Sequence, residues 1–514
     1  MNACWEKGDP APTKRLDAEG LSKRVKIRLT QCYNYVNVYQ TDFLRRCGTF
    51  RRGGEVGRKI INVGDIAAWR GCLGCGACAF VCRKGAVSLV DVLDEGIRPL
   101  VDRAKCDGCG ECVRACPGYK TAHETETPSA ATIRELGMSW GPILEVWEGH
   151  ADDDCIRYYG SSGGVASMLA LYCIEKGGME AILHTGSDNA RPWKSATLHS
   201  RERDEVLCRA GSRYAPASPC EGLGAPAAGK KPWVFVGKPC DIGGVRNVCK
   251  VRPELSVNIG CCISLFCAGT PSTRGTLGLL ERFEVGPEQV QELRFRGRGW
   301  PGHAGIRRKG HADFTHNLSY EECWAYLQQF RPYRCHLCPD GTGELADIAC
   351  GDPWCREPNP GELGRSLVLV RTERGREIVR GALRKGYVHL KRQPPHLLVD
   401  SQPNLYRKRC SVWGRCAAFR LCGLPTPQFR GFSLASNWRR LSMREQARSI
   451  FGTLRRIATR GYLRPLTYVP GAIESHMMPG IERTVGIKIA NINNKDTVTR
   501  KAEWLKIGNS NTPR

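Results

Sequence analysis

Two cysteine motifs with the same spacing constrain the first quarter of this chain more than any other feature of its sequence. Residues 72–82 read CLGCGACAFVC and residues 106–117 read CDGCGECVRACP, so the cysteines of each follow the spacing C-x2-C-x2-C-x3-C. Such a run wraps soft thiolates around one small volume, which suits an iron–sulfur cubane. Zinc sites instead use two well-separated pairs of ligands. The sequence therefore predicts two [4Fe-4S] clusters.

The same spacing is typical of bacterial two-cluster ferredoxins, in which the fourth cysteine of each motif binds the other cluster. On this pattern, one predicted ligand set is Cys72, Cys75, Cys78 and Cys116, and the other is Cys106, Cys109, Cys112 and Cys82. Residues 86–102, between the motifs, alternate well enough to predict a small β-hairpin. Arg83 follows the first motif where Pro117 closes the second, a departure that removes no ligand.

Length, cysteine content and charge narrow the class of protein. The chain has 514 residues, which is too long for one ordinary core, and its 28 cysteines come without an export signal. We therefore expect reduced, metal-holding thiolates in a cytoplasmic protein. No apolar run approaches the ~20 residues of a transmembrane segment. The formal charge of +26 favours acidic partners, although an arginine-rich genome is the simpler explanation; no nucleic-acid-binding motif is present, so we expect no nucleic-acid partner.

From about residue 143 the pattern changes to alternating strand-like and helix-like segments. The Gly/Ser loop 160–164 precedes an apolar helical run, and strands predicted over 233–236 and 258–266 each end in a loop that contains glycine. Open α/β sheets bind ligands beyond the carboxyl ends of their strands, so these loops predict a site for a phosphate-bearing cofactor. The GxGxxG at 297–302 does not open an apolar helix, and we reject a dinucleotide fingerprint there.

At these residues the sequence resembles the beta subunit of coenzyme F420-reducing hydrogenase and its dehydrogenase relatives, a family that includes plant 7-hydroxymethyl chlorophyll a reductase. The matching stretches are SSGGVASMLALY (161–172), VGKPCDIGGVRN (236–247), LFCAGTPSTRGTLGLLE (265–281), FRGRGWPG (295–302) and RCHLCPDGTGELADIACGDPW (334–354). With the cysteine motifs they cover roughly residues 66–430, in the order the family shows. The resemblance implies a flavoprotein with FAD and an α/β core, which exchanges electrons between clusters and a two-electron substrate. In the founding members that substrate is coenzyme F420.

The resemblance also suggests residues for the flavin. Clusters move single electrons and hydride acceptors take two, and a flavin couples the two modes. We expect the loop residues Ser161, Ser162, Gly163 and Gly164 to hold the FAD phosphate or ring edge, and Lys238 to neutralise a phosphate or the anionic reduced ring. A capped helix start is the alternative role of that loop. Asp347 and Asp352 are either acid–base groups or ordinary turn residues, so the catalytic residues stay unknown.

A third metal site is a further prediction. Cys335 and Cys338 need two partners, and Cys240 and Cys267 sit at strand ends where the family motifs converge. These four thiolates would hold one more [4Fe-4S] cluster. Two alternatives stay open: zinc bound by a set of separated pairs, or buried free cysteines that serve as small apolar side chains. The alternative zinc ligands are Cys335, Cys338, Cys350 and Cys355.

The expected fold class is an α/β flavin-binding core with an N-terminal α+β ferredoxin-like domain for two [4Fe-4S] clusters. The predicted order is a basic segment of unknown role, the ferredoxin-type domain, two domains like the N- and C-terminal parts of the F420 hydrogenase/dehydrogenase beta subunit, the second with FAD, and an arginine-rich extension. Their predicted bounds are 1–65, 66–122, 123–228, 229–400 and 401–514.

The extension holds one amphipathic pattern. Apolar residues fall near one helical face, namely Trp438, Leu441, Ile450, Phe451, Leu454 and Ile457. A basic helix of this kind either makes peripheral contact with a membrane or a partner, or covers the core of its own domain.

Together these features predict an iron–sulfur flavoprotein oxidoreductase that passes electrons between ferredoxin-type clusters and FAD, and on to or from a two-electron substrate such as coenzyme F420. The alternative is an electron-transfer subunit that feeds a partner enzyme and has no small-molecule substrate of its own. The expected partner is accordingly a redox protein or a small two-electron substrate.

Overall fold

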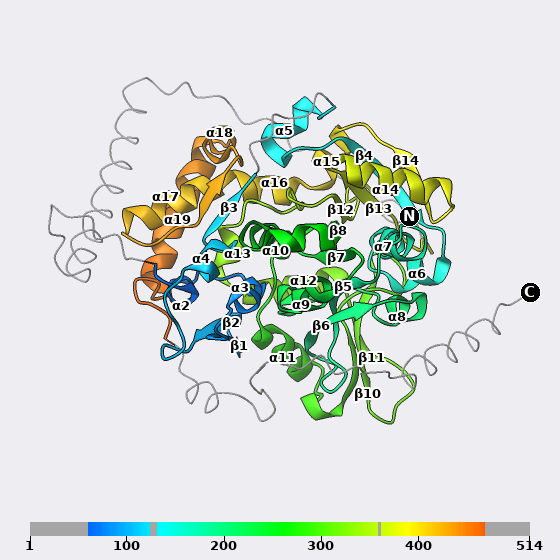
Figure 1. The fold of residues 1–514 in the computed structure, drawn as a ribbon, viewed down its shortest axis with the longest axis horizontal. Helices are drawn as coiled ribbons and strands as arrows, with labels where there is room; N and C mark the ends of the chain where they lie inside the picture. The colour runs from blue at the N-terminus through cyan, green and yellow to red at the C-terminus, as the bar shows by residue number, and fades with distance from the viewer. Residues whose placement is uncertain (1–59, 124–130, 358–360, 468–514) are drawn as a thin grey trace, which may run out of the picture. The chain divides into compact units, whose positions relative to one another are not determined.

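A long mixed β-sheet organises the larger part of the molecule. The computed structural model describes residues 60–123, 131–357 and 361–467 (Figure 1). Most of the predicted N-terminal segment and the end of the predicted extension lie outside these ranges. Within them, the largest sheet has eight strands in the order β14-β4-β13-β12-β8-β7-β5-β6. In chain order they are β4 (Glu145–Ala151), β5 (Ile182–Ser187), β6 (Ser195–Ser200), β7 (Trp233–Gly237), β8 (Ile259–Leu265), β12 (Ile348–Gly351), β13 (Ser366–Val370) and β14 (Val388–Arg392).

The strand directions bring several strand ends to one edge of this sheet. β5, β7, β8 and β12 are parallel neighbours, whereas β13 runs antiparallel to both β12 and β4. β4 consequently runs the same way as β12, so the carboxyl ends of β4, β12, β8 and β7 lie at the same edge. The strands predicted over 233–236 and 258–266 are confirmed as β7 and β8. They could be predicted because parallel strands that are buried on both faces are rich in apolar residues such as Val and Ile.

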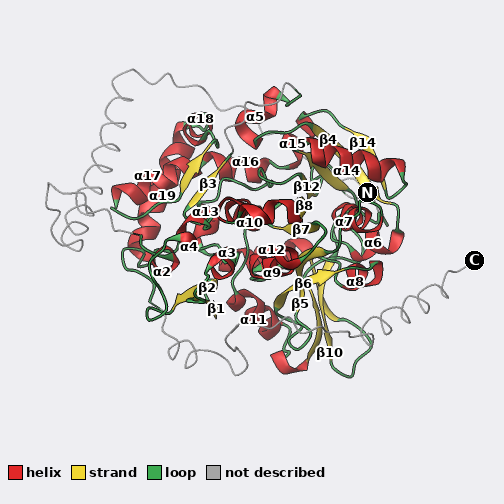
Figure 2. Ribbon diagram, in the orientation of Figure 1, coloured by secondary structure: helices red, strands yellow, loops and turns green. Residues whose placement is uncertain are grey.

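Helices cover both faces of the sheet (Figure 2). Residues of α7 (Val165–Glu175) and α14 (Glu373–Arg384) share one apolar core with the sheet, and residues of α10 (Pro239–Val251) share another. Neighbouring cysteines of β8 point into different cores, Cys262 into the core with α10 and Cys261 into the core with α7. Shorter helices are α5 (Arg134–Trp140), α6 (Asp154–Tyr159), α8 (Arg203–Cys208) and α9 (Gly224–Ala228).

The two cysteine motifs lie in a small module, residues 60–122, which we call the ferredoxin module. Its elements are α2 (Val63–Ala68), α3 (Ala77–Val81), β1 (Val87–Val92), β2 (Gly96–Val101), α4 (Glu111–Arg114) and β3 (Lys120–Ala122). β1 and β2 form the predicted antiparallel hairpin. Each motif turns into its short helix through a glycine with positive φ, 88° at Gly76 and 73° at Gly110, a conformation that other residues rarely adopt.

A separate three-stranded sheet holds the rejected GxGxxG. The sheet consists of β9 (Val290–Arg294), β10 (His303–Arg308) and β11 (Thr315–Ser319), and it packs against α11 (Thr273–Arg282) and α12 (Tyr320–Leu327). Residues 297–302 form the loop between β9 and β10 and open no helix. The structure thus confirms that this stretch is no dinucleotide fingerprint.

The described part of the extension, residues 401–467, is mostly helical. It contains α16 to α19 and strand β15, and it lies beside α13 and α15. The bounds are α13 (Tyr333–His336), α15 (His396–Ser401), α16 (Pro403–Cys410), α17 (Val412–Leu421), β15 (Gln428–Arg430), α18 (Leu434–Arg439) and α19 (Met443–Thr459). β15 pairs in parallel with β3, so the extension is attached to the ferredoxin module. Among the described residues, no helix is both long enough and apolar enough to cross a membrane.

The predicted apolar face of the extension is wrong in one respect. Phe451 is 59% exposed, and the buried row of α19 is instead Ser449, Thr453 and Ile457. The reason is a close approach between α17 and α19. A Cβ added to Gly414 of α17 would lie too close to the Ser449 side chain, so small residues rather than large apolar ones make this contact.

Candidate functional site

Four cysteines drawn from both motifs surround one cavity. Cys72, Cys75, Cys78 and Cys116 line it among mostly apolar side chains. Each of the four is only 7–8% exposed. The structure therefore brings the last cysteine of the second motif to the first three of the first motif, as the predicted crossed set requires. That these thiols bind a cluster stays a prediction.

The second predicted set also lies together, but nearer to solvent. Burial raises the pKa of the Cys112 thiol, and the neighbouring Cys109, Cys106 and Cys82 raise it further. Cys109 is exposed, and Cys82 and Cys106 are half-buried. The two sets thus differ in environment, the first being enclosed and the second reaching the surface.

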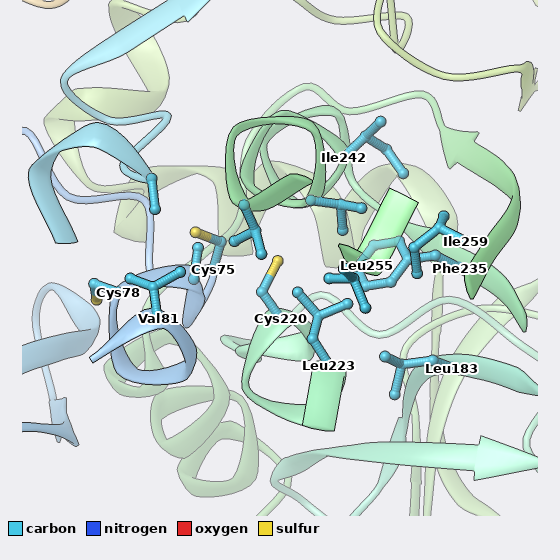
Figure 3. Packing of buried hydrophobic residues seen from close by; sticks show 14 of the residues in the cluster. Cys75, Cys78, Val81, Leu183, Cys220, Leu223, Phe235, Ile242, Leu255 and Ile259 are labelled. Carbon is cyan, nitrogen blue, oxygen red and sulfur yellow. The ribbon is translucent and has the colours of Figure 1, made fainter. Parts of the chain in front are cut away.

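The first set is packed against the α/β core by a residue that sequence reasoning missed. The backbone N–H of Cys220 donates to the Cys75 carbonyl oxygen at 2.9 Å, and the Cys220 thiol donates to the Asp241 carbonyl oxygen at 3.4 Å. Cys75 and Cys220 belong to the same apolar cluster (Figure 3). A Cβ on Gly244 of α10 would lie 3.0 Å from the Cys220 sulfur and 3.2 Å from the Cys75 sulfur. No local pattern around residue 220 signals this role.

The four cysteines of the predicted third site also converge. Cys240 lies in the first turn of α10, Cys267 follows β8, and Cys335 and Cys338 lie on and after α13. Burial raises the pKa of Cys267 to about 11, and the nearby Cys335 and Cys338 thiols add to the effect. Burial likewise raises the pKa of Cys240, which has Cys267 and Cys338 as neighbours. This cysteine quartet therefore offers four thiols in one region.

The alternative zinc set is not assembled. Cys350 lies in the core beneath α7, where burial alone raises its pKa to about 12, and Cys355 is exposed. Over residues 60–123, 131–357 and 361–467, no three or more His, Cys, Asp or Glu side chains are grouped to hold a single metal ion. A cubane spreads its four thiolates over four irons and so sets them farther apart.

A second cavity lies between Cys72 of the first set and Cys335 of the quartet. It shares Cys72, Leu73 and Gly74 with the wall of the first cavity. Lys238 and Cys335 also line it. The two cavities are therefore adjacent, and residues 72–74 form part of the wall of both.

Lys238 places a fixed positive charge in the second cavity. Its ammonium Nζ lies 2.7 Å from the Asp241 carboxylate, whose side chain is 1% exposed. Burial by itself would lower the pKa of Lys238, but Asp241 and the Cys240 thiol hold it above its ordinary value. The side chain therefore stays charged at any physiological pH.

The residues of the predicted Ser/Gly loop differ in how their polar groups are hydrogen-bonded. The Ser162 hydroxyl donates to the Arg365 carbonyl oxygen at 2.5 Å, and the Gly163 N–H donates to the Ser366 hydroxyl at 2.9 Å, so both residues fix the loop to β13. Ser161 Oγ accepts the Ser212 N–H at 2.6 Å, which leaves its own hydroxyl hydrogen for another acceptor. Gly164, with φ of 73°, opens α7.

The Ser/Gly loop and Lys238 lie at the same edge of the sheet but not side by side. The loop follows α6 and reaches the ends of two strands, because the Gly163 carbonyl accepts the Ala151 N–H of β4 at 2.7 Å and the Ser162 hydroxyl lies 3.4 Å from the Gly351 carbonyl oxygen of β12. Lys238 follows β7, two strand spacings or about 10 Å from β12. A group that contacts both must therefore extend along the edge.

The two candidate acid–base residues already have hydrogen-bond partners within the protein. Asp347 accepts hydrogen bonds from Arg246 at 3.1 Å and from the Thr372 hydroxyl at 2.8 Å. Asp352 binds both terminal nitrogens of Arg296, at 2.8 and 2.6 Å. Each carboxylate thus joins two family motifs or strands, and neither uses the predicted turn to its own backbone.

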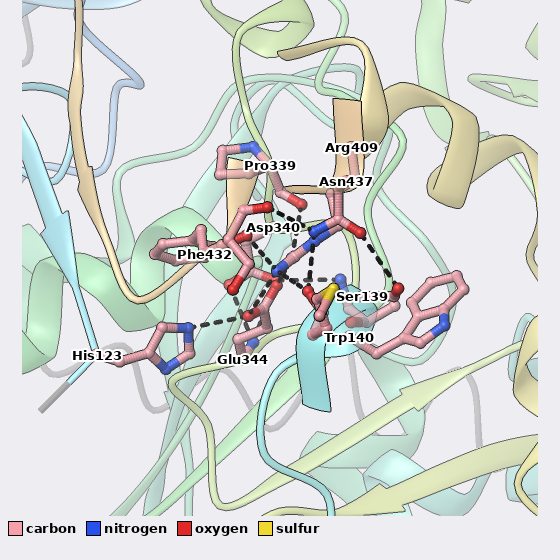
Figure 4. Close-up of polar contacts among 12 residues, drawn as sticks. His123, Ser139, Trp140, Pro339, Asp340, Glu344, Arg409, Phe432 and Asn437 are labelled. Carbon is pink, nitrogen blue, oxygen red and sulfur yellow. Dashed lines mark hydrogen bonds and ion pairs between the residues drawn. The ribbon is translucent and has the colours of Figure 1, made fainter. Parts of the chain in front are cut away.

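A buried polar network, which the sequence did not predict, ties the extension to the segment after Cys338 (Figure 4). Glu344 pairs with Arg409 of α16 and with His123, whose Nε2 lies 2.9 Å from the carboxylate. Burial by itself would raise the pKa of Glu344, but Arg409 and His123 lower it to about 2. The Glu344 carboxylate is therefore ionised at neutral pH and forms an ion pair with the Arg409 guanidinium.

Comparison with known proteins agrees with the sequence resemblance. The family model for the carboxyl-terminal part of the coenzyme F420 hydrogenase/dehydrogenase beta subunit matches residues 231–395, and the model for its amino-terminal part matches residues 146–223. A 4Fe-4S dicluster domain matches residues 71–120. The predicted family and the predicted iron–sulfur domain are thereby confirmed.

Individual relatives are distant. The chain is 25% identical over 322 residues to the coenzyme F420-dependent sulfite reductase of Methanocaldococcus jannaschii, over 60% of this chain and 45% of that protein. It thus spans less than half the length of that relative. It is 22% identical over 345 residues to one of the subunits of the F420H2 dehydrogenase of Methanosarcina mazei, over 65% of this chain and 86% of the relative.

Among solved structures, a chain of the F420-reducing [NiFe] hydrogenase complex from Methanosarcina barkeri is similar. The TM-score is 0.45 at 18% sequence identity, over 56% of this chain and 97% of that chain.

Proposed function

Because the chain belongs to the coenzyme F420 hydrogenase/dehydrogenase beta-subunit family and has a 4Fe-4S dicluster domain, we propose that it is an iron–sulfur flavoprotein oxidoreductase. The eight cysteines of the ferredoxin module would hold two [4Fe-4S] clusters. FAD in the α/β core would exchange their electrons with a two-electron substrate such as coenzyme F420.

The pair of adjacent cavities is the observation that carries this proposal. The first cavity is lined by one complete crossed cysteine set, and the second begins at Cys72 and reaches Lys238 and Cys335. An electron that arrives at the exposed second set has, in this arrangement, a continuous route inward: second set, first set, quartet. We propose that the quartet holds a third [4Fe-4S] cluster on that route.

The residues present fit a flavin in part. When bound, FAD would convert one-electron into two-electron transfer. Lys238 offers a permanent charge for a phosphate or for a ring that gains negative charge, and Ser161 offers one unused hydroxyl hydrogen. The Ser162 hydroxyl and the Gly163 N–H already have protein partners, so these two groups contribute first to the position of the loop.

A second candidate function is supported by the relatives' own names. The Methanosarcina mazei protein is named as one of the subunits of a dehydrogenase. This chain would then deliver electrons to a partner enzyme and bind no small substrate of its own.

Titration with reduced coenzyme F420 separates the two. Anaerobically prepared full-length protein is expected to retain flavin, and F420H2 should bleach both flavin and cluster absorbance. The double variant Lys238→Gln/Asp241→Asn removes the buried charges as a pair and should weaken flavin retention at least about tenfold, the loss of one charge-assisted contact. Lys231→Gln, at an exposed position, is the matched control. Clusters that reduce with dithionite but never with F420H2 would favour the electron-delivery function, and protein that binds no flavin would refute the FAD role.

A further inference from the structure

We propose that the solvent-exposed end of the ferredoxin module is a docking face for a small acidic one-electron carrier protein. This inference rests on the proposed function, because it requires a cluster at the second cysteine set. It adds the port at which electrons enter or leave and the chemistry of the partner that uses it.

The first observation is the difference in exposure between the two crossed sets. All members of the first set are buried, and Cys220 and Gly244 of the α/β core pack directly against it. In the second set, Cys109 is exposed and Cys82 and Cys106 are half-buried. Electron transfer between proteins needs close approach of the two centres, so of the two crossed sets the second is the one that an external carrier can approach.

The second observation is a group of cationic side chains on the loops that hold the second set. We call these residues the basic rim, and every one of them is exposed: Arg83, Lys84, Arg103, Lys105 and Arg114. Each lies within three residues of a second-set cysteine along the chain. Arg83, Arg114 and Lys105 are 71%, 65% and 62% exposed at their side chains. Arg83 is also the residue that departs from the Pro117 pattern of the other motif.

The acidic residues nearby do not cancel the rim. Glu111 lies between three arginines, 3.2 Å from Arg252, 3.8 Å from Arg114 and 3.9 Å from Arg83. Asp102 lies 3.6 Å from Lys105 and also accepts the Ala104 N–H at 3.0 Å, and Asp107 accepts the Cys109 N–H at 3.1 Å. The five cationic side chains of the rim outnumber these three carboxylates by two, which leaves a net positive charge around an exposed redox site.

The net positive charge of the basic rim favours a negatively charged partner protein. A positive rim attracts negatively charged proteins and raises their association rate by about 10- to 1,000-fold at low salt. A nucleic acid would also be attracted, but it has no use for a redox centre placed in the middle of the rim. In each encounter the reduced carrier loses one electron, which reduces the cluster of the second set; no bond forms and no proton moves. Two encounters supply the pair needed by a two-electron acceptor.

Stopped-flow reduction of the full-length, cluster-loaded protein by a purified, reduced acidic ferredoxin tests the proposal. The variant Arg83→Glu/Lys105→Glu should lower the second-order rate constant at least about tenfold at low ionic strength. It should also flatten the fall of that rate with added salt. The matched control Arg384→Glu/Lys385→Glu, with the same change of charge at the end of α14, should change the rate less than about twofold.

Two further measurements, the rate of reduction by methyl viologen radical and the iron content per chain, distinguish a failure of the docking face from a failure of the proposed function. Both should be equal in the rim variant and the wild type, because the clusters themselves are untouched. Full iron content with equal ferredoxin rates for rim variant, control and wild type would overturn the docking face alone. A rim variant that loses only binding to a DNA duplex and keeps its ferredoxin rate would overturn it as well. Protein without iron would overturn the proposed function.

Discussion

Replacing Glu344 by glutamine should release the extension from the core. The Glu344 side chain is 1% exposed and its partner Arg409 is 3% exposed. Arg409 also donates to the carbonyl oxygen of Phe432 at 2.9 Å. Glutamine keeps the shape of the side chain but removes the charge, so the guanidinium of α16 stays buried without its counter-ion.

Two estimates of the free-energy cost of Glu344→Gln agree. The pKa of Glu344 falls from an ordinary 4.5 to about 2 in the folded protein, which at ~1.4 kcal/mol per pKa unit corresponds to about 3 kcal/mol. Removing one partner of a buried ion pair costs ~3–5 kcal/mol in general. We therefore expect Glu344→Gln to destabilise the attachment of α16 by about 3 kcal/mol, a factor of about 100 in its opening equilibrium.

Hydrogen exchange measured by mass spectrometry on the full-length protein reads this opening directly. Amides of α16 should exchange about 100-fold faster in Glu344→Gln. Asp152→Asn is the matched control, because it breaks an ion pair whose partners are 59% and 56% exposed and which contributes at most about 1 kcal/mol. Exchange of α16 within about fivefold of the wild type in Glu344→Gln would refute the role of the network.

Four further outcomes follow from the same structure. Because its folded-state pKa is depressed, Glu344 contributes stability above pH 4.5 that is lost as pH falls towards 2, so the wild-type Tm should drop more steeply across that window than that of Glu344→Gln. Gly452→Ala in α19, where a Cβ meets nothing within 4 Å, should raise the unfolding free energy by about 1 kcal/mol in thermal or urea denaturation. Gly244→Ala should instead lose up to about four irons per chain on anaerobic gel filtration, since its Cβ would press on the sulfurs of Cys220 and Cys75. Cys220→Ala should change the midpoint potential of the enclosed cluster by roughly 20–40 mV in an EPR-monitored redox titration, because a polar thiol beside the Cys75 sulfur is replaced by a methyl group.

Local patterns predicted those parts of the fold that depend on near neighbours in sequence. The C-x2-C-x2-C steps fix three thiols in one loop, and the ferredoxin pattern supplied the fourth, which is why Cys116 was placed correctly beside Cys72. Continuous Val/Ile runs marked β7 and β8 because strands buried on both faces have little room for polar residues. The Gly/Ser loop marked the start of α7 for a similarly local reason.

Contacts between distant segments left no such signal. Cys220 meets Cys75 across 145 positions of sequence, and Arg409 meets Glu344 across 65. Nothing in the neighbourhood of either residue encodes its partner. The Phe451 error has the same origin, because helical periodicity cannot show that Gly414 allows α17 to approach α19 through small side chains. The Ser162 hydroxyl likewise donates to the Arg365 carbonyl, 203 positions away, a contact that the local sequence does not indicate.

The central claim is that the crossed cysteine sets each close around an iron cubane. Mössbauer and EPR spectra of anaerobically prepared, full-length protein, with iron counted per chain, test it most directly. We predict at least about eight irons per chain, all in [4Fe-4S] form, and paramagnetic cubane signals after dithionite reduction. Fewer than about eight irons together with no cubane signal on reduction would contradict the account.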